Sequence, residues 1–498
     1  MTDDAAAIQF GTDGWRATLD EFTDERVRMV GQAVATHLRE AGHDGETVAV
    51  GYDARGHSRG FAEELARVLC ANGFDALLPE RDTPTPVVAW TVRERGLAGA
   101  LMVTASHNPP EYNGVKFVPS DGAPALADAT DDVEEALAEP ESLPEDEWGT
   151  VTETDLVGDY LDHAVEFVAE VRDEPVDLSG LTVAYDAMHG SGRGVTDRLL
   201  ERAGADLVRL RCETDPKFGG GAPEPVAERV EDLIERVQSG DADLGIVNDG
   251  DADRVSVVTP DRGFLDPNLF FAAVYDDLLE AQRASERTSS AERSSADHSS
   301  GHGPREDGAT ASAGDVVRTV STSSIVDRVA EAHGQSVHET AVGFKYVAEA
   351  MADNDALMGG EESGGFGVTA HLRNKDGVLL ALLASAASHE QSLDDRVDDL
   401  LAEHGEIHQG RVSVDCPDDR KAGVLADLEA DLPDSVAGQA VDSVSTVDGF
   451  KMTLADGTWV LVRPSGTEPK LRVYAEAGSQ DRVEELLDAG RDVVEPLV

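Results

Sequence analysis

The sequence predicts an α/β protein with three similar mixed α/β domains around a central cleft and a smaller C-terminal α+β domain. Three observations carry this prediction. A strand–turn–helix pattern recurs along the chain, a strand–loop–strand pattern recurs after it, and short strands become frequent after Gln409. We expect the domains to span residues 1–150, 151–262, 263–400 and 401–498.

The first pattern is a strand, a Gly/Ser turn and a helix. Residues 47–53 are the expected strand of the first copy, and residues 61–72 are its helix, which Gly73 ends. The second copy starts with residues 181–186, and a weaker third copy starts with residues 315–320. Because Tyr-Asp-Ala closes the strand in the first two copies, we interpret the pattern as an internal repeat.

The second pattern places a polar loop between two short apolar strands. The loops differ: residues 104–114 carry a serine, residues 248–254 carry three aspartates, and residues 359–365 carry glycines and glutamates. If the three units pack around a shared centre, these loops meet there. The sequence therefore predicts one site assembled from three domains.

Three further segments complete the predicted architecture. Residues 155–172 are expected to form one helix that links the first two domains. Residues 282–314 have no periodicity and hardly any apolar residues, so we expect a disordered surface insertion away from the chemistry. In the C-terminal domain we expect strands and a last helix at residues 412–414, 446–454, 459–462, 471–475 and 481–493.

The charge balance excludes two classes of partner. The 498 residues include 41 Lys and Arg against 99 Asp and Glu, a formal net charge of −58. This balance argues against a nucleic acid and against an anionic membrane surface. At about 1 M salt the Debye length is about 3 Å, which screens the self-repulsion of such a surface. The composition is therefore typical of a halophile, and an acidic enzyme of a mesophile is the alternative.

The three cysteines, Cys70, Cys212 and Cys416, are far apart and odd in number. This spacing provides no disulfide framework and no zinc knuckle, which indicates a reducing compartment. The N-terminus is acidic and does not resemble a signal peptide, and no apolar run reaches the about 20 residues that span a bilayer. We expect a soluble cytoplasmic protein that is a monomer or a dimer.

The serine loop presents one hydroxyl among Asn, Gly and two prolines. Pro109 and Pro110 remove two backbone donors and fix φ, so the loop that holds Ser106 should be stiff. An ordinary turn is the alternative. Ser106 and His107 do not form a hydrolase dyad by spacing, because neighbours in an extended chain face opposite sides. No GxSxG motif surrounds the serine.

The acidic loop places Asp249, Asp251 and Asp253 at alternate positions, which point the same way in an extended segment. Three carboxylates that face one point repel one another unless a hard cation lies between them, so Mg²⁺ is the natural ligand. An EF-hand is rejected, because Arg254 and Pro260 occupy its required Gly and Glu positions. A plain acidic turn remains the alternative.

Two other loops have the chemistry of a sugar-phosphate site. Glu361 and Ser363 can accept hydrogen bonds from vicinal hydroxyls, and a Gly-rich linker is the alternative. In the last domain, cations, hydroxyls and a glycine form an anion nest, for which a charged hairpin turn is the alternative. The residues of this nest are Arg463, Ser465, Gly466 and Thr467. Residues 189–194 suggest a dinucleotide loop, but Val195 stands at the last glycine of GxGxxG, so we do not predict NAD.

Together these loops resemble those of the α-D-phosphohexomutase superfamily, the phosphoglucomutases and phosphomannomutases. The matching segments are TASHNPPEYNGVKF at 104–117, DGDADR at 249–254, GGEESGG at 359–365 and RPSGTEPKLR at 463–472. Two shorter segments also match, FGTDGWRA at 10–17 and AVGFKY at 341–346. The resemblance implies three α/β domains around one cleft and a serine that is phosphorylated and passes its phosphate to a sugar.

The resemblance also implies roles for single residues. The phosphate on Ser106 would complete the Mg²⁺ site of the three aspartates, with Arg16 near the reactive phosphate and Arg254 facing the substrate. Lys345 would contact the sugar and favour glucose. The distal phosphate of the substrate would be held by Arg463, Ser465, Gly466, Thr467 and Arg472. Ala17 stands where glycine is frequent in the family.

The expected reaction interconverts hexose 1-phosphate and hexose 6-phosphate through phosphorylated Ser106 and a bound hexose 1,6-bisphosphate. Lys116 is the expected base for the attacking hydroxyl, with a pKa lowered by nearby cations and burial, and His107 assists. Glucose is the preferred sugar, and mannose, a bifunctional enzyme and glucosamine are the alternatives. A phosphoserine-type sugar phosphatase and a binding protein without turnover are alternatives of other classes.

Overall fold

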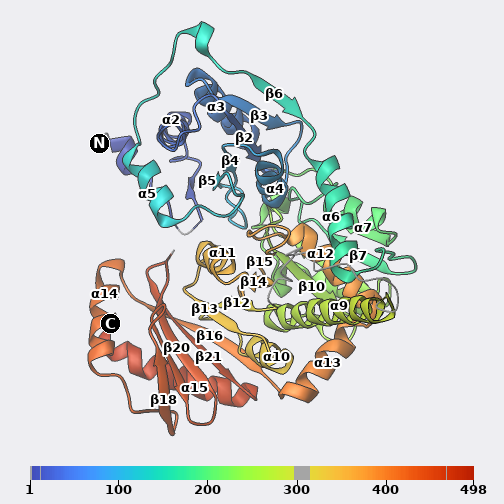
Figure 1. The fold of residues 1–498 in the computed structure, drawn as a ribbon. Helices are drawn as coiled ribbons and strands as arrows, with labels where there is room; N and C mark the ends of the chain where they lie inside the picture. Colours follow the sequence, from blue (N-terminus) through green and yellow to red (C-terminus); the bar gives the residue numbers. More distant parts are fainter. Residues whose placement is uncertain (1–2, 12, 297–313, 467) are drawn as a thin grey trace.

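The computed structural model describes residues 3–11, 13–296, 314–466 and 468–498, with the side chains of 286–296 outside this description. Figure 1 shows four successive domains, with domain I at the top, domain IV at the lower left and domains II and III between them. Each has its own sheet, of six, five, four and six strands in chain order. The predicted fold class, three mixed α/β domains and a smaller C-terminal domain, is confirmed.

Domain I contains a sheet in the order β1-β5-β4-β2-β3-β6. Strand β2 pairs in parallel with β3 and β4, and β4 continues into an antiparallel hairpin with β5. The elements are α1 (Asp3–Ala6), β1 (Trp15–Thr18), α2 (Asp24–Glu40), β2 (Thr47–Tyr52), α3 (Ser58–Ala71), β3 (Asp75–Pro79), α4 (Thr85–Arg95), β4 (Gly99–Val103), β5 (Tyr112–Pro119), α5 (Ala127–Glu135) and β6 (Val151–Thr154).

Domain II repeats this plan in a sheet ordered β11-β10-β9-β7-β8. Strand β7 pairs in parallel with β8 and β9, and β9 forms an antiparallel hairpin with β10. The linking helix that we expected at 155–172 is α6 (Val157–Arg172). The other elements are β7 (Thr182–Asp186), α7 (Thr196–Arg202), β8 (Asp206–Leu210), α8 (Glu231–Gln238), β9 (Leu244–Asn248), β10 (Val255–Thr259) and β11 (Gly263–Phe264).

Domain III is the third copy, in the order β13-β12-β14-β15, with β12 parallel to β13 and β14 and with a β14–β15 hairpin. The internal repeat therefore exists in three dimensions, with a polar loop at each hairpin. The elements are α9 (Pro267–Ala296), β12 (Val316–Thr319), α10 (Ile325–His333), β13 (Val337–Thr340), α11 (Phe344–Asp353), β14 (Met358–Gly360), β15 (Phe366–Val368), α12 (Gly377–Glu390) and α13 (Leu393–His404).

The expected insertion at 282–314 needs a correction at its start. Helix α9 continues to Ala296, so residues 282–296 are helical where we predicted no regular structure. These residues continue α9, and their lack of apolar periodicity is the reason why the helix was not predicted here. The remainder of the expected insertion, residues 297–313, lies outside the described residues.

Domain IV is a β-sheet of antiparallel neighbours in the order β16-β21-β20-β19-β18-β17. Helix α15 packs against β16, β20 and β21. The elements are β16 (His408–Asp415), α14 (Asp418–Ala430), β17 (Ser435–Val436), β18 (Gln439–Ser445), β19 (Phe450–Leu454), β20 (Trp459–Pro464), β21 (Lys470–Ala477) and α15 (Gln480–Val494). Short 3-10 turns lie at Glu145–Glu147, Phe218–Gly220, Ala227–Arg229 and Glu495–Leu497.

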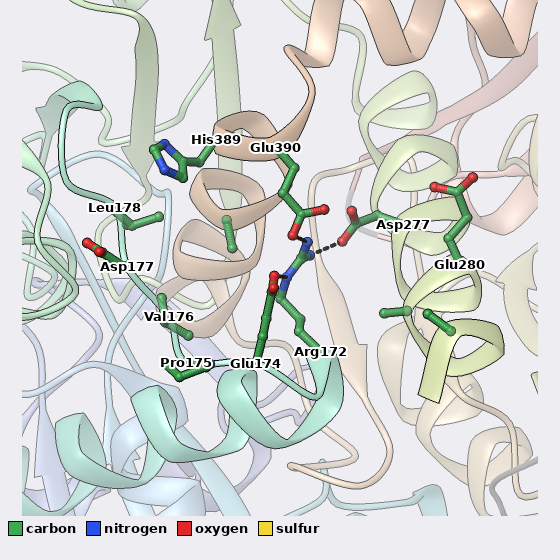
Figure 2. A pocket seen from close by; sticks show the side chains of 13 residues that line it. Arg172, Glu174, Pro175, Val176, Asp177, Leu178, Asp277, Glu280, His389 and Glu390 are labelled. Atoms are coloured by element: carbon green, nitrogen blue, oxygen red, sulfur yellow. Dashed lines mark hydrogen bonds and ion pairs between the residues drawn. The ribbon is translucent and has the colours of Figure 1, made fainter. Parts of the chain in front are cut away.

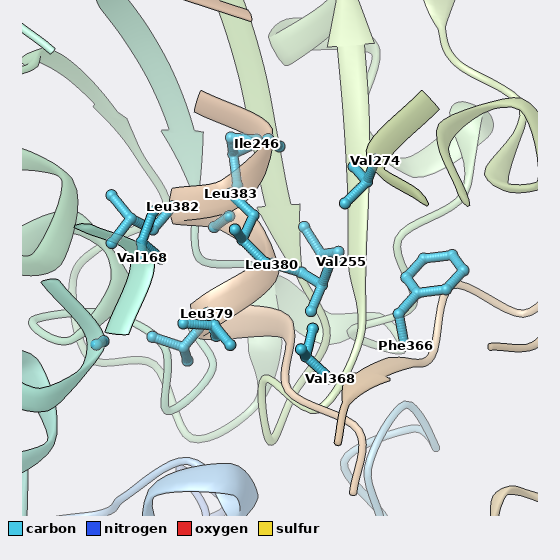
Figure 3. Packing of buried hydrophobic residues seen from close by; sticks show 14 of the residues in the cluster. Val168, Ile246, Val255, Val274, Phe366, Val368, Leu379, Leu380, Leu382 and Leu383 are labelled. Carbon is cyan, nitrogen blue, oxygen red and sulfur yellow. The ribbon is translucent and has the colours of Figure 1, made fainter. Parts of the chain in front are cut away.

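The largest hydrophobic core joins the first three domains around helix α12, which is buried from Gly377 to Ala387. A helix that is apolar all round belongs in an interior, where it can contact several elements at once. Figure 3 shows leucines of α12 among apolar side chains of α6, β9, β10, α9 and β15. No described helix is long and apolar enough to cross a bilayer.

A buried ionic cluster ties α6, α9, α12 and α13 together. Arg172 at the end of α6 pairs with Asp277 of α9 and with Glu390 at the end of α12 (Figure 2). Asp277 also accepts from Arg396 of α13 at 3.2 Å. Because unpaired buried charges are costly, this cluster requires all four helices to be in place.

The Asp277→Ala substitution should lower the free energy of unfolding by about 3 kcal/mol, the lower end of the range for breaking a buried pair. Each arginine keeps another carboxylate, which limits the loss. The matched control is Glu280→Ala, since this side chain is 57% exposed and pairs with the same Arg396. Urea unfolding followed by circular dichroism should show less than about 1 kcal/mol for the control. Equal losses in both variants would contradict a role for the buried pair.

Candidate active site

Ser106 lies in the β4–β5 loop, fully buried and with a positive φ of 50°. Its Oγ donates to Asp249 Oδ2 at 2.8 Å, although 143 residues separate the two in the chain. Its backbone N–H donates to Thr104 Oγ1 at 2.8 Å. The structure therefore brings together the serine loop of domain I and the acidic loop of domain II.

The stiffness of the serine loop comes from a residue that sequence reasoning missed. Arg55, just after β2, donates to four carbonyls of the loop, those of Ser106, Asn108, Pro109 and Tyr112, at 2.6–3.1 Å. Its Nε pairs with Asp53 Oδ2 at 3.0 Å, and burial raises the pKa of Asp53. The only sequence signal for the role of Arg55 was the repeated Tyr-Asp-Ala that precedes it at the end of β2.

The three aspartates lie in the β9–β10 loop, all buried, with one ligand atom of each within 4.8 Å of the others. Asp251 Oδ1 and Asp253 Oδ1 are buried without a hydrogen-bond partner. Burial, followed by the neighbouring charges of Asp251 and Asp253, raises the pKa of Asp249 well above its usual value. Orphaned carboxylate oxygens facing one point fit a hard divalent cation such as Mg²⁺.

Two elements hold this acidic loop in place. Thr85, at the start of α4, donates from Oγ1 to Asp251 Oδ2 at 2.7 Å and from its backbone to Asp251 O at 3.0 Å. Ser191 donates from its backbone N–H and its Oγ to Gly250 O, at 3.0 and 3.1 Å. A Cβ on Gly190 would lie 2.9 Å from the carbonyl oxygens of Asp249 and Gly250. The glycine at this position therefore allows two backbones to approach closely.

Lys116 of β5 corrects one prediction. Its buried ammonium lies 3.0 Å from Asp13, Asp251 and Asp253. Burial alone would lower the pKa of Lys116, but the three carboxylates raise it well above its usual value. We predicted a lowered pKa, and this prediction was wrong because the sequence did not reveal that carboxylates, rather than cations, surround the side chain.

Asp13 and Lys375 are site residues that sequence reasoning missed. Lys375 Nζ lies 2.9 Å from Asp253 and 3.5 Å from Asp13, so Asp13 bridges two buried ammonium groups. Burial raises the pKa of Asp13, but the neighbouring lysines hold it well below its usual value. The available signals were the position of Asp13 within residues 10–17 and the Lys-Asp-Gly that starts α12.

His107 and Arg16 both lie in the site. The left-handed φ of Ser106 turns the chain, so His107 Nδ1 is 3.3 Å from Ser106 Oγ, although spacing predicted that the two side chains diverge. The charge of Arg254, together with burial, lowers the pKa of His107 to about 2. Arg16 donates to Asn108 Oδ1 at 3.3 Å and pairs with Asp13 at 3.1 Å.

The loop of residues 359–365 in domain III, called the sugar loop below, lies against the acidic loop of residues 248–254. Arg254 and Gly365 form an isolated β-bridge, and Val255 N donates to Gly364 O at 3.1 Å. Glu361 is buried, which raises its pKa, and its Oε1 accepts from Gly343 N at 3.0 Å. Ser363 Oγ lies 3.4 Å from Glu361 Oε2. The three predicted loops therefore meet.

Lys345 is buried in the first turn of α11, with Nζ 5.3 Å from the ring centre of Tyr346. Its contact with a sugar stays a prediction. Lys345 stands two residues after Gly343, the N-cap of α11, whose φ of 129° turns the chain into the helix.

The fourth loop joins β20 to β21 in domain IV. Arg463 and Ser465 are buried and Gly466 is exposed, while Arg472 pairs with Glu468 at 3.0 Å. Lys421 of α14 donates to the backbone carbonyls of Ser465 and Glu468, both at 2.6 Å. Thr467 lies outside the described residues. The loop is basic and backed by a lysine, as an anion site requires.

Comparisons with known proteins agree with this architecture. Family models described as phosphoglucomutase/phosphomannomutase match in chain order, with α/β/α domain I at residues 7–143, domain II at 158–263, domain III at 303–404 and the C-terminal domain at 412–493. The structure of a phosphoglucomutase/phosphomannomutase family protein from Burkholderia thailandensis aligns with a TM-score of 0.80 at 21% identity, over 100% of this chain and 98% of that chain.

Curated relatives match over nearly the whole length. The probable phosphoglucosamine mutase of Methanopyrus kandleri is 34% identical over 487 residues, 97% of each chain. The phosphoglucomutase/phosphomannomutase of Thermococcus kodakarensis is 29% identical over 490 residues, 98% of each chain. With the four domain matches in order, the chain belongs to the phosphoglucomutase/phosphomannomutase family, the isomerases that interconvert sugar phosphates.

Proposed function

We propose that the protein is a phosphohexomutase that interconverts glucose 1-phosphate and glucose 6-phosphate through a phosphoserine at Ser106. The observation that carries this proposal is the 2.8 Å hydrogen bond from Ser106 to Asp249 inside a buried triad of aspartates. A nucleophile in direct contact with a divalent-cation site is the arrangement that phosphoryl transfer requires.

The proposed reaction has two transfers at one place. In the first, the free sugar hydroxyl attacks the phosphorus on Ser106, so the P–O bond to serine breaks and a bond to the sugar forms. The bound hexose 1,6-bisphosphate then reorients, so that its other phosphate faces Ser106. In the second transfer, Ser106 Oγ attacks the other phosphate, and the product leaves with the phosphoserine restored.

The surroundings of Lys116 lead us to propose a role for it that differs from our first expectation. Lys116 has a raised pKa, so it is charged at neutral pH and suits the role of acid toward the leaving oxygen. His107 lies 3.3 Å from Ser106 Oγ, and because its lowered pKa makes the imidazole a weak base, we propose that it assists by orienting the Ser106 hydroxyl. Arg16 and Lys375 add positive charge beside the transferred group.

Asp249, Asp251, Asp253 and the phosphate of Ser106 would hold Mg²⁺. When bound, the ion would offset the negative charge on the transferred phosphoryl group. Thr85 and Ser191 keep the acidic loop in the conformation in which its free oxygens converge. These residues therefore preorganise the site before any ligand arrives.

A second anion site distinguishes a mutase from a phosphatase. A bisphosphate that reacts at either end must be held by one phosphate while the other reacts. An enzyme that only hydrolyses a phosphoserine does not need such a second site. We assign the distal phosphate to Arg463, Ser465, Gly466, Thr467 and Arg472, and the sugar hydroxyls to Glu361, Ser363, Arg254 and Lys345. The basic loop backed by Lys421 supports the first assignment.

Glucose is the sugar that we propose, on the resemblance of residues 341–346 to the corresponding loop of phosphoglucomutases. The curated relatives carry different names, phosphoglucosamine mutase and phosphoglucomutase/phosphomannomutase. Mannose and glucosamine phosphates are therefore the rival substrates.

A turnover panel tests the proposal. With Mg²⁺, the protein should convert glucose 1-phosphate to glucose 6-phosphate with a higher kcat/KM than mannose or glucosamine 1-phosphate, and without release of free phosphate. Coupled assays at about 0.1 M and about 2 M KCl should show higher activity at high salt, where the charge of −58 is screened. Free phosphate as the main product would favour the phosphatase.

The Ser106→Ala substitution should abolish turnover, by about 10³-fold or more, because the phosphoryl acceptor is lost. Mass spectrometry of the intact protein should show one phosphate on part of the wild type and none on the variant. The control is Thr91→Ala, a buried hydroxyl of α4 that donates to Val87 O outside the site. Persistent phosphorylation of the Ser106→Ala variant would place the phosphate elsewhere.

Removal of divalent cations with EDTA should lower activity by about 100-fold or more, because the ion stabilises the transferred charge by several kcal/mol. Mg²⁺ should restore it. Thr85→Val should raise the Mg²⁺ concentration for half-maximal activity about tenfold, because Asp251 loses its hydrogen-bond donor. Thr91→Val, on the same helix, serves as the control. Full activity after dialysis against EDTA would refute the metal assignment.

A further inference from the structure

Asp448 stands in the turn between β18 and β19, next to Gly449. Gly449 has a φ of +86°, and a Cβ there would lie 2.2 Å from Val462 O. Only glycine can therefore occupy this position, and the turn is pressed against strand β20. As a consequence, the carboxylate of Asp448 is fixed beside the base of the β20–β21 loop.

A single oxygen of Asp448 accepts hydrogen bonds from two domains. Oδ2 accepts from Arg463 Nε at 2.8 Å, within domain IV. The same oxygen accepts from the backbone N–H of Val342 at 3.2 Å, in the β13–α11 loop of domain III. Asp448 thus joins an arginine of the proposed distal phosphate site to the loop that precedes Lys345.

The connection continues into the sugar loop. Gly343, the residue after Val342, donates its N–H to Glu361 Oε1 at 3.0 Å. The successive N–H groups of residues 342 and 343 therefore bind two carboxylates, one in domain IV and one in the sugar loop. Val342 also packs against a small apolar cluster shared by Val320 of domain III and Trp459 of domain IV.

From this geometry we propose that Asp448 is a positioning residue that couples the distal phosphate loop to the sugar loop. The proposal rests on the proposed function, in which a bisphosphate is held at its distal phosphate while its ring contacts Glu361. Arg463 Nε donates to Asp448, and this bond restricts the orientation of the guanidinium with which we propose that Arg463 binds a phosphate. A phosphate bound to Arg463 would then stabilise the position of the Asp448 carboxylate, which also orients the backbone of residues 342–343.

Simple docking of domain IV on domain III is the competing explanation, and the structure provides a control for it. Ser324 Oγ donates to Glu476 Oε1 at 2.5 Å across the same pair of domains. Neither residue contacts the phosphate loop or the sugar loop through the hydrogen bonds described. Ser324→Ala therefore removes this side-chain hydrogen bond between the two domains, although the backbone N–H of residue 324 still donates to Glu476, and it leaves the Arg463–Asp448–Val342 connection intact.

The first experiment compares steady-state constants with the sugar 1-phosphate that the wild type turns over best. Asp448→Ala should raise KM about tenfold and change kcat by less than about threefold, as expected for a coupling between binding groups. Asp448→Asn keeps an acceptor oxygen and should recover part of the loss. Ser324→Ala and Asp442→Ala, an exposed residue of β18, should leave KM within about twofold.

The second experiment measures coupling directly by the binding of glucose 6-phosphate, with calorimetry as the readout. A double-mutant cycle of Arg463→Lys and Glu361→Gln should be non-additive in the wild-type background and additive in the Asp448→Ala background. Circular dichroism spectra of all variants check that they are folded. Additivity in both backgrounds, or a KM change in Ser324→Ala equal to that in Asp448→Ala, would overturn the inference.

These outcomes separate the inference from the function on which it rests. If the wild type shows no mutase turnover with any hexose 1-phosphate, the proposed function fails before a variant is compared. If the wild type is an active mutase and Asp448→Ala retains its KM, the proposed function stands and the coupling role of Asp448 is wrong.

Discussion

Buried charge is the constraint on which this structure depends. The buried Asp249, Asp251 and Asp253 and the partly exposed Asp13 lie among Lys116, Lys375 and Arg254 at the junction of the first three domains. A buried ion without a partner costs several kcal/mol, so each domain supplies charges that the others need. The site therefore exists only when the domains are docked.

The packing of helix α12 fixes the position of one of these charges, the ammonium group of Lys375. Its buried leucines fill the core between domains II and III, and its N-cap, Asp376, accepts from Val378 N and Leu379 N. Lys375 directly precedes this cap, so the position of its ammonium follows from the packing of the helix. The hydrophobic core and the charged site are thus one arrangement: moving α12 by a fraction of a turn would withdraw Lys375 from Asp253.

The sequence predicted the elements that are local in the chain, and missed those that depend on contacts between distant residues. The repeat, the serine loop and the aspartates were recognisable because spacing within about ten residues defines a strand or a loop. Arg55, Asp13, Lys375 and Asp448 were not recognisable, because an isolated charged residue has no periodicity that marks its partner. The pKa of Lys116 was predicted in the wrong direction for the same reason: its three carboxylate neighbours, Asp13, Asp251 and Asp253, are each more than one hundred residues away. His107 approached Ser106 because of one left-handed φ, which spacing rules for extended chains do not include.

The two ends of the proposed substrate site have different requirements. The serine loop is held by four hydrogen bonds from one buried arginine, and the acidic loop by Thr85 and Ser191. Phosphoryl transfer at a fixed nucleophile needs this preorganisation, because a displacement of about 1 Å can cost about 100-fold in rate. Under the proposed function the distal loop has a different requirement, since it must hold the same bisphosphate in two orientations. In that proposal Arg463, held by Asp448, would fix where a phosphate binds, and the exposed Gly466, which has no Cβ, would let a phosphate approach the loop backbone in either orientation of the sugar.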